Sequence, residues 1–413
     1  MPHPTSSSDH GAFSQRLARV DRFFADEYIR PGKLAGALVQ VWRGGRLALN
    51  SLHGMADRER GAPMAEDTLF RIYSMTKPIT SVALLMLFEQ GLVALDDPVA
   101  QYIPEWAGLQ VYQGGELGAF KTRAPERPMQ IVDLLRHTSG LTYGFQQQTP
   151  VDAAYRKLKL GDVALAGTLE GMVAALAGLP LAFAPGQAWN YSVSTDVLGY
   201  LVGKISGVPF PDFVRQRILD PLGMADTGFH VPPEKAGRLA ACYAVGQLGR
   251  AVEAGRGLSL QDDPRTSVFL QPPAFFSGGG GLVSTAADYL RFARMLLGGG
   301  ALEGTRLLGR KTVELMTANH LPGGVDLPQL SRSMFSEAAY SGVGFGLGVA
   351  CTLDPARTLT LGSPGDFFWG GAASTFFVVD PREDMVMLLF TQLLPSSAYP
   401  MRRQLRALVY GAL

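Results

Sequence analysis

Residues 70–80 read FRIYSMTKPIT, and this stretch decides how the rest of the chain is interpreted. The residues that follow favour a helix that runs to about Gln90 and stops at Gly91. A proline in the interior of a helix would break it, but a proline in the first turn is tolerated, and the proline here lies close to the start. We therefore expect Ser74 at the beginning of this helix, with Lys77 on the same face.

A serine hydroxyl is a weak nucleophile at neutral pH and needs a base beside it. Lys77 brings an amine within reach of Ser74, but a lysine in water has a pKa of about 10.4. It can accept a proton only if burial or a neighbouring charge lowers that pKa. Ile72, Met75 and Ile79 are apolar, and a helix N-terminus directs N–H groups towards a developing oxyanion. Alternatively, Ser74 is a helix cap and Lys77 lies on a solvated face, and the motif alone leaves this reading open.

Strand patterns are found near both ends of the chain. Residues 37–42 and 46–51 flank Arg43-Gly44-Gly45, which is typical of a β-hairpin. Further strand candidates and a closing helix follow in the last third: strands at 343–351, 358–361, 374–379 and 385–391, and a helix at 400–413. Between these parts the pattern is helical or irregular.

These patterns predict an α/β (α+β) fold with an antiparallel sheet flanked by helices. Residues 1–91 and 271–413 form one discontinuous sheet domain in this prediction. Residues 92–270 form a mainly helical domain inserted between the two halves.

Composition excludes several classes of protein. The 413 residues are 47% hydrophobic, and 37 basic residues against 36 acidic ones give a net charge of +1, which does not predict a nucleic-acid partner. The longest strongly apolar run, 82–88, is far shorter than the roughly 20 residues of a membrane span. No signal-peptide pattern opens the sequence, so we expect a soluble cytoplasmic protein without a membrane partner. Cys242 and Cys351 form no metal-type spacing and are expected to be buried apolar residues.

Several further segments resemble the signatures of serine β-lactamases and penicillin-binding proteins, in the order that these families use. They are LLRHTSGL at 134–141, FAPG at 183–186 leading into WNYS at 189–192, GGGGLVST at 278–285 and WGG at 369–371. The chain is most similar to family VIII carboxylesterases, the esterase branch with a class C β-lactamase fold. This resemblance implies a class C β-lactamase-like architecture.

The resemblance also implies roles for individual residues. Ser74 is the nucleophile that becomes acylated, and Lys77 accepts its proton. Tyr191 shares the proton network, either as a base with a lowered pKa or as a relay that protonates the leaving alcohol. The backbone N–H groups of Ser74 and Ala372 form the oxyanion hole.

Four residues are expected to bind substrate: Tyr143, Trp369, Gly370 and Gly371. Trp369 stands where β-lactamases carry the lysine of Lys-Thr-Gly, which helps to hold the carboxylate of a β-lactam. An uncharged residue there favours a neutral acyl group. Position 193 is Val where the family's second signature, Tyr-x-Asn, has Asn. Both departures favour small neutral esters over antibiotics.

Other chemistries find less support in the sequence. His137 and His53 have no acid or nucleophile near them and are interpreted as hydrogen-bonded loop histidines. No Gly-x-Ser-x-Gly motif is present, which argues against an α/β-hydrolase, and neither a metal nor a cofactor is implied. The main prediction is a serine esterase with a small-molecule ester as its substrate. A β-lactamase or D-amino-acid peptidase, an acyltransferase and an inactive binding protein remain alternatives, and the oligomeric state is left open.

Overall fold

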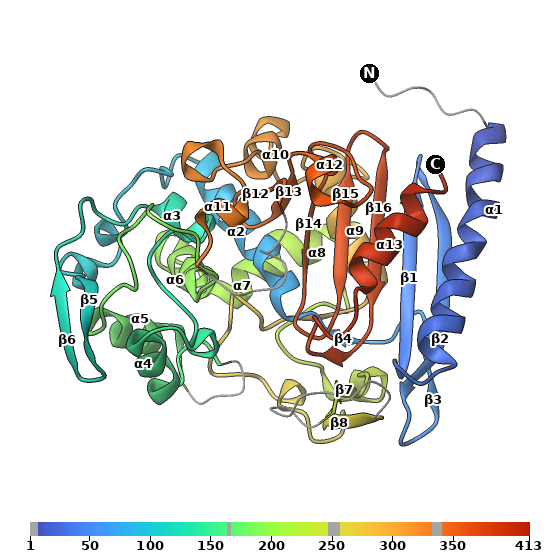
Figure 1. Cartoon of the computed structure of the whole chain (residues 1–413), viewed down its shortest axis with the longest axis horizontal. Helices are drawn as coiled ribbons and strands as arrows, with labels where there is room; N and C mark the ends of the chain where they lie inside the picture. Colours follow the sequence, from blue (N-terminus) through green and yellow to red (C-terminus); the bar gives the residue numbers. More distant parts are fainter. Residues whose placement is uncertain (1–6, 163–166, 247–256, 333–340) are drawn as a thin grey trace.

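An eight-stranded antiparallel sheet forms one side of the molecule, in the strand order β12-β13-β14-β15-β16-β1-β2-β3 (Figure 1). The computed structural model describes residues 7–162, 167–246, 257–332 and 341–413. The sheet strands are β1 (Gly36–Arg43), β2 (Arg46–Asp57), β3 (Ala62–Pro63), β12 (Val343–Phe345), β13 (Ala350–Thr352), β14 (Phe367–Gly370), β15 (Phe376–Asp380) and β16 (Met385–Phe390). Both ends of the chain therefore contribute to one sheet, as the sequence predicted.

The register joins the two halves of the sheet at its centre. β1 pairs with β2 on one side, where Val39 faces Ser51, and with β16 on the other, where Leu38 faces Phe390. All residues of β15 and β16 are buried. Strands that are covered on both faces read as continuous apolar runs, which explains why period-two alternation is weak in this part of the sequence.

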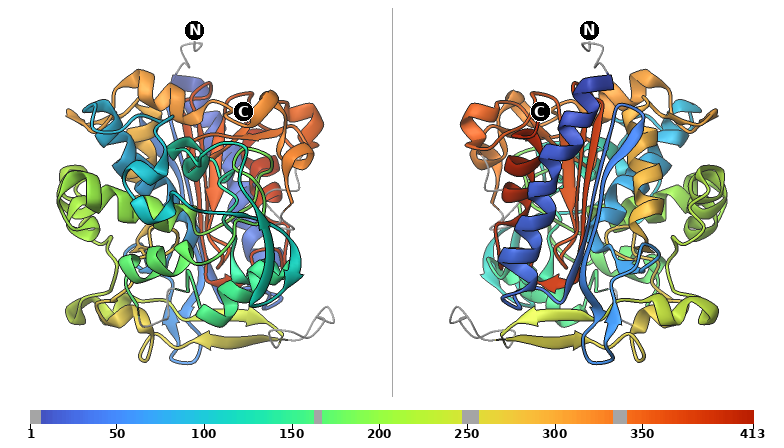
Figure 2. Two further views of the ribbon diagram at one scale, coloured as in Figure 1. Left: turned by 90° about the vertical axis from the view of Figure 1, so that its left-hand side faces the viewer. Right: turned by 90° about the vertical axis from the view of Figure 1, so that its right-hand side faces the viewer.

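Helices cover both faces of the sheet. α1 (Ser7–Phe24) and α13 (Met401–Tyr410) lie together on one face (Figure 2). α9 (Ala286–Leu297) covers the other face, where the Tyr289 ring packs 5.3 Å from that of Phe377. Between the sheet and the helical half lies α2 (Thr76–Glu89), which is buried all round over most of its length and packs on α6 (Ser194–Ser206).

The remaining elements surround this framework. The further α-helices are α3 (Ile131–Leu135), α4 (Pro150–Leu158), α5 (Leu169–Ala177), α7 (Phe210–Val214), α8 (Asp220–Leu222), α10 (Arg310–Thr317), α11 (Leu327–Leu330) and α12 (Pro355–Thr358). The short 3-10 and π segments are η1 (Ala25–Ile29), η2 (Tyr73–Met75), η3 (Val99–Gln101), η4 (Pro104–Trp106), η5 (Gly144–Gln146), η6 (Arg215–Leu219), η7 (Pro233–Arg238), η8 (Val268–Leu270) and η9 (Pro322–Gly324). The smaller strands are β4 (Phe70–Arg71), β5 (Val111–Glu116), β6 (Ala119–Arg123), β7 (Cys242–Val245), β8 (Leu258–Asp262), β9 (Val283–Ser284), β10 (Ala301–Leu302), β11 (Thr305–Arg306) and β17 (Leu393–Leu394).

Two local predictions need correction. The strand expected at 358–361 is wrong, because Asp354 caps a short helix, α12, that begins at Pro355. The candidate at 343–351 is two strands, β12 and β13, which pair with each other as a hairpin. The predicted hairpin near the N-terminus is present as β1 and β2, and the closing helix is α13.

The middle third of the chain is helical but also contains two hairpins, β5–β6 and β7–β8. β7 pairs in parallel with β17, so this part is tied directly to the C-terminal segment. The domain boundaries drawn from the sequence stay a prediction. Cys242 and Cys351 are buried and free, as expected. Every helix in the described residues is too short or too polar to cross a membrane.

Candidate active site

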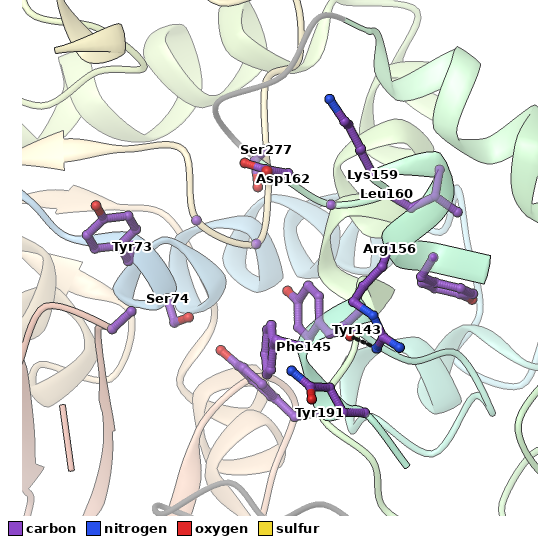
Figure 3. A pocket seen from close by; sticks show the side chains of 17 residues that line it. Tyr73, Ser74, Tyr143, Phe145, Arg156, Lys159, Leu160, Asp162, Tyr191 and Ser277 are labelled. Atoms are coloured by element: carbon purple, nitrogen blue, oxygen red, sulfur yellow. Dashed lines mark hydrogen bonds between the residues drawn. The ribbon is translucent and has the colours of Figure 1, made fainter. Parts of the chain in front are cut away.

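Ser74 lies at the junction between the sheet and α2. It belongs to η2, and α2 begins two residues later, so the predicted helix start is correct to within a turn. The preceding residue, Tyr73, has a φ of 41°, which is rare for an aromatic residue and shows that the surrounding packing fixes the backbone here. β4 pairs with β9 just before this turn and anchors it. Ser74 opens onto a cavity of about 500 Å³ (Figure 3).

The Lys77 amine lies within hydrogen-bonding distance of the Ser74 hydroxyl. Its Nζ is 3.4 Å from Ser74 Oγ, 3.1 Å from the Tyr143 hydroxyl and 2.7 Å from the Gly279 carbonyl oxygen. Only 1% of the Lys77 surface is exposed. This burial lowers the pKa of Lys77 to about 7, so a large share of the amine is neutral at physiological pH. This environment is compatible with the predicted role of Lys77 as a base, and the alternative in which Lys77 lies on a solvated face is wrong.

A buried carboxylate that the sequence did not single out, Asp196, lies close to this amine. It is on the first turn of α6 and accepts hydrogen bonds from Ser277 Oγ (2.5 Å) and from the Gly279 N–H (2.9 Å). Its charge raises the pKa of Lys77 and so opposes the effect of burial. The Gly279 loop therefore touches Lys77 through its carbonyl and Asp196 through its amide. A carboxylate five residues after Tyr191, at the start of an apolar helix, was the available signal.

Two tyrosines line the cavity next to Ser74. The Tyr191 hydroxyl points towards Ser74 in Figure 3, and Lys77 Nζ lies 4.4 Å from the centre of the Tyr191 ring. Burial raises the pKa of Tyr191, although hydrogen bonds with Ser74 and Trp369 act in the opposite direction. Tyr191 therefore keeps its proton at neutral pH, which favours the relay over the phenolate base. Tyr143 also lines the cavity, and its pKa is raised well above the usual value by burial.

The Trp369-Gly370-Gly371 segment places a backbone turn beside the nucleophile. A side chain at Gly371 would collide with the carbonyl oxygen of Ile72, so only glycine permits this approach. Ser74 and Ala372 consequently line the same cavity, as an oxyanion hole made of their N–H groups requires.

The other predicted substrate-binding residues are placed differently. Trp369, Gly370 and Gly371 are not among the residues that line the cavity. Trp369 is fully buried, and its ring packs 5.6 Å from that of Tyr191. The Trp369 indole therefore packs against the Tyr191 ring in the core and does not contact the cavity.

The outer wall of the cavity comes from the helical half. Tyr143 stacks on Phe145, with ring centres 4.8 Å apart, and Phe145 is 56% exposed. Arg156 and Lys159 line the exposed side, away from Ser74 (Figure 3). In the part of the chain that the structure describes, the lining residues are Tyr73, Ser74, Tyr143, Gly144, Phe145, Gln147, Tyr155, Arg156, Lys159, Leu160, Gly161, Asp162, Tyr191, Ser277, Gly279, Gly280 and Ala372.

Neither of the two histidines considered from the sequence lines this cavity. His137 is buried, and its Nδ1 lies 3.2 Å from Ser192 Oγ, so it is hydrogen-bonded as predicted. Burial lowers its pKa well below the usual value and keeps it neutral. His53 lies in β2 rather than in a loop and contacts Ser51 and Asp21. Among the described residues, no cluster of three His, Cys, Asp or Glu side chains is arranged to hold a metal ion.

Replacement of Tyr191 and replacement of Tyr143 should affect the activity to different extents. We expect Tyr191→Phe to lower kcat for ester hydrolysis by at least about 10²-fold, the lower range for lost acid–base assistance. Tyr143→Phe removes only a hydrogen bond to Lys77 and should cost less. Steady-state kinetics on 4-nitrophenyl butyrate measure both effects. Full activity in Tyr191→Phe would reassign Tyr191 to packing.

Comparisons with known proteins agree with this geometry. The Beta-lactamase family matches residues 21–411. Esterase EstB from Burkholderia gladioli is 34% identical over 432 residues, which covers 98% of this chain and 99% of that protein. Protein Rv1367c from Mycobacterium tuberculosis is 38% identical over 367 residues, 88% of this chain and 87% of that protein. The solved structure of EstCE1, described as a hydrolase with promiscuous acyltransferase activity, matches with a TM-score of 0.76 and 27% identity and covers 98% of this chain and 99% of its own.

The matches confirm the predicted fold class and the predicted class of enzyme. They extend over nearly the whole chain and include both halves of the sheet and the helical part between them. The roles given to Ser74, Lys77 and Tyr191 stay predictions, which the mutations described here test. The chain belongs to the beta-lactamase family and is a serine hydrolase with that family's fold.

Proposed function

We propose that the protein is a carboxylesterase that hydrolyses small neutral esters through an acyl-enzyme on Ser74. The observation that carries this proposal is the Lys77 amine, which lies 3.4 Å from Ser74 Oγ and has a pKa lowered to about 7. The names of two relatives, an esterase and a hydrolase, support an ester as the acyl donor. We place the protein in the esterase branch, family VIII, and in the cytoplasm.

Acylation begins when neutral Lys77 takes the proton of Ser74 Oγ as that oxygen attacks the ester carbonyl. The carbonyl oxygen becomes an oxyanion, which the N–H groups of Ser74 and Ala372 stabilise. Tyr191 passes its proton to the departing alcohol oxygen and regains one from the Lys77 ammonium. The C–O bond to the alcohol breaks, and the acyl group remains on Ser74.

Deacylation runs the same steps with water in place of the alcohol. Lys77, again neutral, accepts a proton from water through the hydroxyl network, and the new oxyanion occupies the same pair of N–H groups. The carboxylic acid leaves, and Ser74 Oγ regains its proton. No step requires Tyr191 to be a phenolate at rest, which agrees with its raised pKa.

The preference for neutral esters rests on the residues around Ser74. Position 369, where the family's β-lactamases carry a lysine, holds a buried tryptophan that does not reach the cavity. Among the described residues, the cations that line the cavity are Arg156 and Lys159, and both lie on its exposed side (Figure 3). A penicillin carboxylate next to Ser74 would lose solvation without the lysine at position 369 that matches its charge in β-lactamases, which is costly.

We expect kcat/KM for 4-nitrophenyl butyrate to exceed that for benzylpenicillin by at least about 10²-fold, the scale of one lost charge-assisted contact at a buried position. Both values are measured on the same enzyme preparation, with Ser74→Ala as the blank. A higher value for the penicillin would replace the esterase with a β-lactamase. Absence of turnover on esters, penicillins and D-amino-acid peptides alike would favour an inactive binding protein.

Acyl transfer is the second candidate, and the size of the cavity favours it. A volume of about 500 Å³ is in the range of sites that hold drug-sized ligands and leaves room for an acceptor beside a short acyl group. An acceptor alcohol added to the esterase assay should then divert the acyl group into a new ester, which chromatography detects.

A further inference from the structure

A partly buried arginine, Arg402, contacts the backbone turn that carries Ala372. It is on the first turn of α13 and is not among the residues that line the cavity. Its Nη2 donates hydrogen bonds to the carbonyl oxygens of Gly371 (2.8 Å) and Thr375 (3.0 Å). A side chain at Gly370 would collide with the guanidinium, so glycine at this position allows the arginine its close approach.

The Gly371 carbonyl, which accepts the hydrogen bond from Arg402, shares a peptide group with the Ala372 N–H. The Gly371 carbonyl and the Ala372 N–H belong to the same planar trans peptide and therefore point in opposite directions. Arg402 contacts the carbonyl end, whereas Ala372 lines the cavity together with Ser74. A charged donor on a peptide carbonyl polarises that peptide and makes its N–H a stronger donor. The guanidinium thus acts on the N–H that the mechanism aims at the oxyanion.

The rest of the turn is fixed by the same contacts. The Gly371 oxygen also accepts the Ser374 N–H at 3.1 Å, and the Gly371 N–H donates to the Thr375 oxygen at 2.9 Å. Arg402 therefore joins the two ends of a closed turn, 371–375. Because the turn cannot rotate without breaking these bonds, the Ala372 N–H is oriented before substrate arrives.

The positive charge of the Arg402 guanidinium contributes to the site in addition to its hydrogen bonds. Burial lowers the pKa of Arg402 to about 9, so the guanidinium remains charged at neutral pH. Its charge also lowers the pKa of Tyr191. Position 369 holds tryptophan where the family's β-lactamases carry a lysine, and Arg402 supplies a cation to the turn that follows β14.

We propose that Arg402 is a positioning residue of the oxyanion hole, which polarises and orients the Gly371–Ala372 peptide through the Gly371 carbonyl. This inference rests on the proposed acyl-enzyme mechanism. An oxyanion exists only in the transition state and the tetrahedral intermediate, so the contribution of Arg402 appears in kcat rather than in KM.

The test compares Arg402→Met with Arg402→Lys and with Arg403→Met. Arg403 is the exposed neighbour on the same helix and donates to Leu359, so its variant matches the charge change away from the turn. On 4-nitrophenyl butyrate we expect kcat to fall by about 10- to 10²-fold in Arg402→Met, below the loss of a direct oxyanion donor, with KM nearly unchanged. Arg402→Lys keeps a charged donor and should recover most of the rate.

A second readout separates this role from simple support of the fold. Butylboronic acid forms a tetrahedral anion on a catalytic serine, so its inhibition constant should rise in Arg402→Met by the same factor as kcat falls. Unchanged kcat and boronate affinity in a folded Arg402→Met would overturn the proposal. So would a loss that Arg402→Lys does not recover and that is matched by a rise in KM.

Should Arg402→Met fail to fold, Arg402→Lys decides alone. Its smaller loss of kcat must then be matched by an equal loss of boronate affinity at constant KM. Any other pattern contradicts the proposal. If the wild-type protein shows no Ser74-dependent ester turnover, the proposed function itself fails, which is a different result from normal turnover that is insensitive to Arg402.

Discussion

Ser74→Ala should reduce ester hydrolysis to the background rate, a loss of about 10⁴-fold or more, because the proposed mechanism forms the acyl-enzyme on Ser74. The fold should be unaffected. Ser74 is only partly buried, and its hydrogen bond with Lys77 is long, at 3.4 Å. Initial rates on 4-nitrophenyl butyrate and a thermal unfolding curve of the same sample measure both quantities.

Ser277→Ala is the matched control for this change. Ser277 lines the same cavity, but its hydroxyl is bound to Asp196 rather than to Lys77. We expect this variant to keep its activity within about 10-fold, since it loses one hydrogen bond and no reacting atom. Near-wild-type turnover in a correctly folded Ser74→Ala would reject the mechanism. Loss of turnover in Ser277→Ala alone would mean that Ser277, and not Ser74, is the nucleophile.

Lys77→Met should lower kcat/KM by at least about 10²-fold, because Ser74 loses its base. The loss should not add to that of Ser74→Ala, since the two residues act as a unit. In the wild-type protein, kcat/KM should rise with pH through about 7, where Lys77 becomes neutral. A rate on 4-nitrophenyl butyrate that is independent of pH from 5 to 9 would contradict this role for Lys77.

Asp196→Asn provides the control for that titration. The Asp196 charge raises the pKa of Lys77, so its removal should move the midpoint of the pH profile to lower pH. Asparagine retains an oxygen that can accept from Ser277 and Gly279. A midpoint that stays in place would mean that a group other than Lys77 titrates.

Replacement of Lys77 should change the stability of the fold in the opposite sense from the activity. Between pH 7 and about 10 the unfolded chain binds a proton at this lysine that the native protein does not, because burial lowers the native pKa. The lysine therefore destabilises the fold increasingly as the pH falls through this range. Lys77→Met should be at least as stable as the wild-type protein at pH 7.

The sequence determined the local features of the site. The spacing of Ser74 and Lys77 follows from helical geometry, and the helix start follows from the proline in the first turn. The β1–β2 hairpin follows from its glycines, and the ordered family segments identified the fold. Each of these features depends on residues that are close together in the chain.

The tertiary structure decided which distant residues surround the reacting atoms. Asp196, Gly279 and Arg402 reach the site from a helix, a loop and the C-terminal helix, and no local spacing shows that they meet near Lys77 and Ala372. The structure also placed Trp369 in the core, although its sequence position suggested contact with substrate. The physical reason is that spacing is set by local backbone geometry. Burial, which lowers the pKa of Lys77, arises only when separate segments pack together.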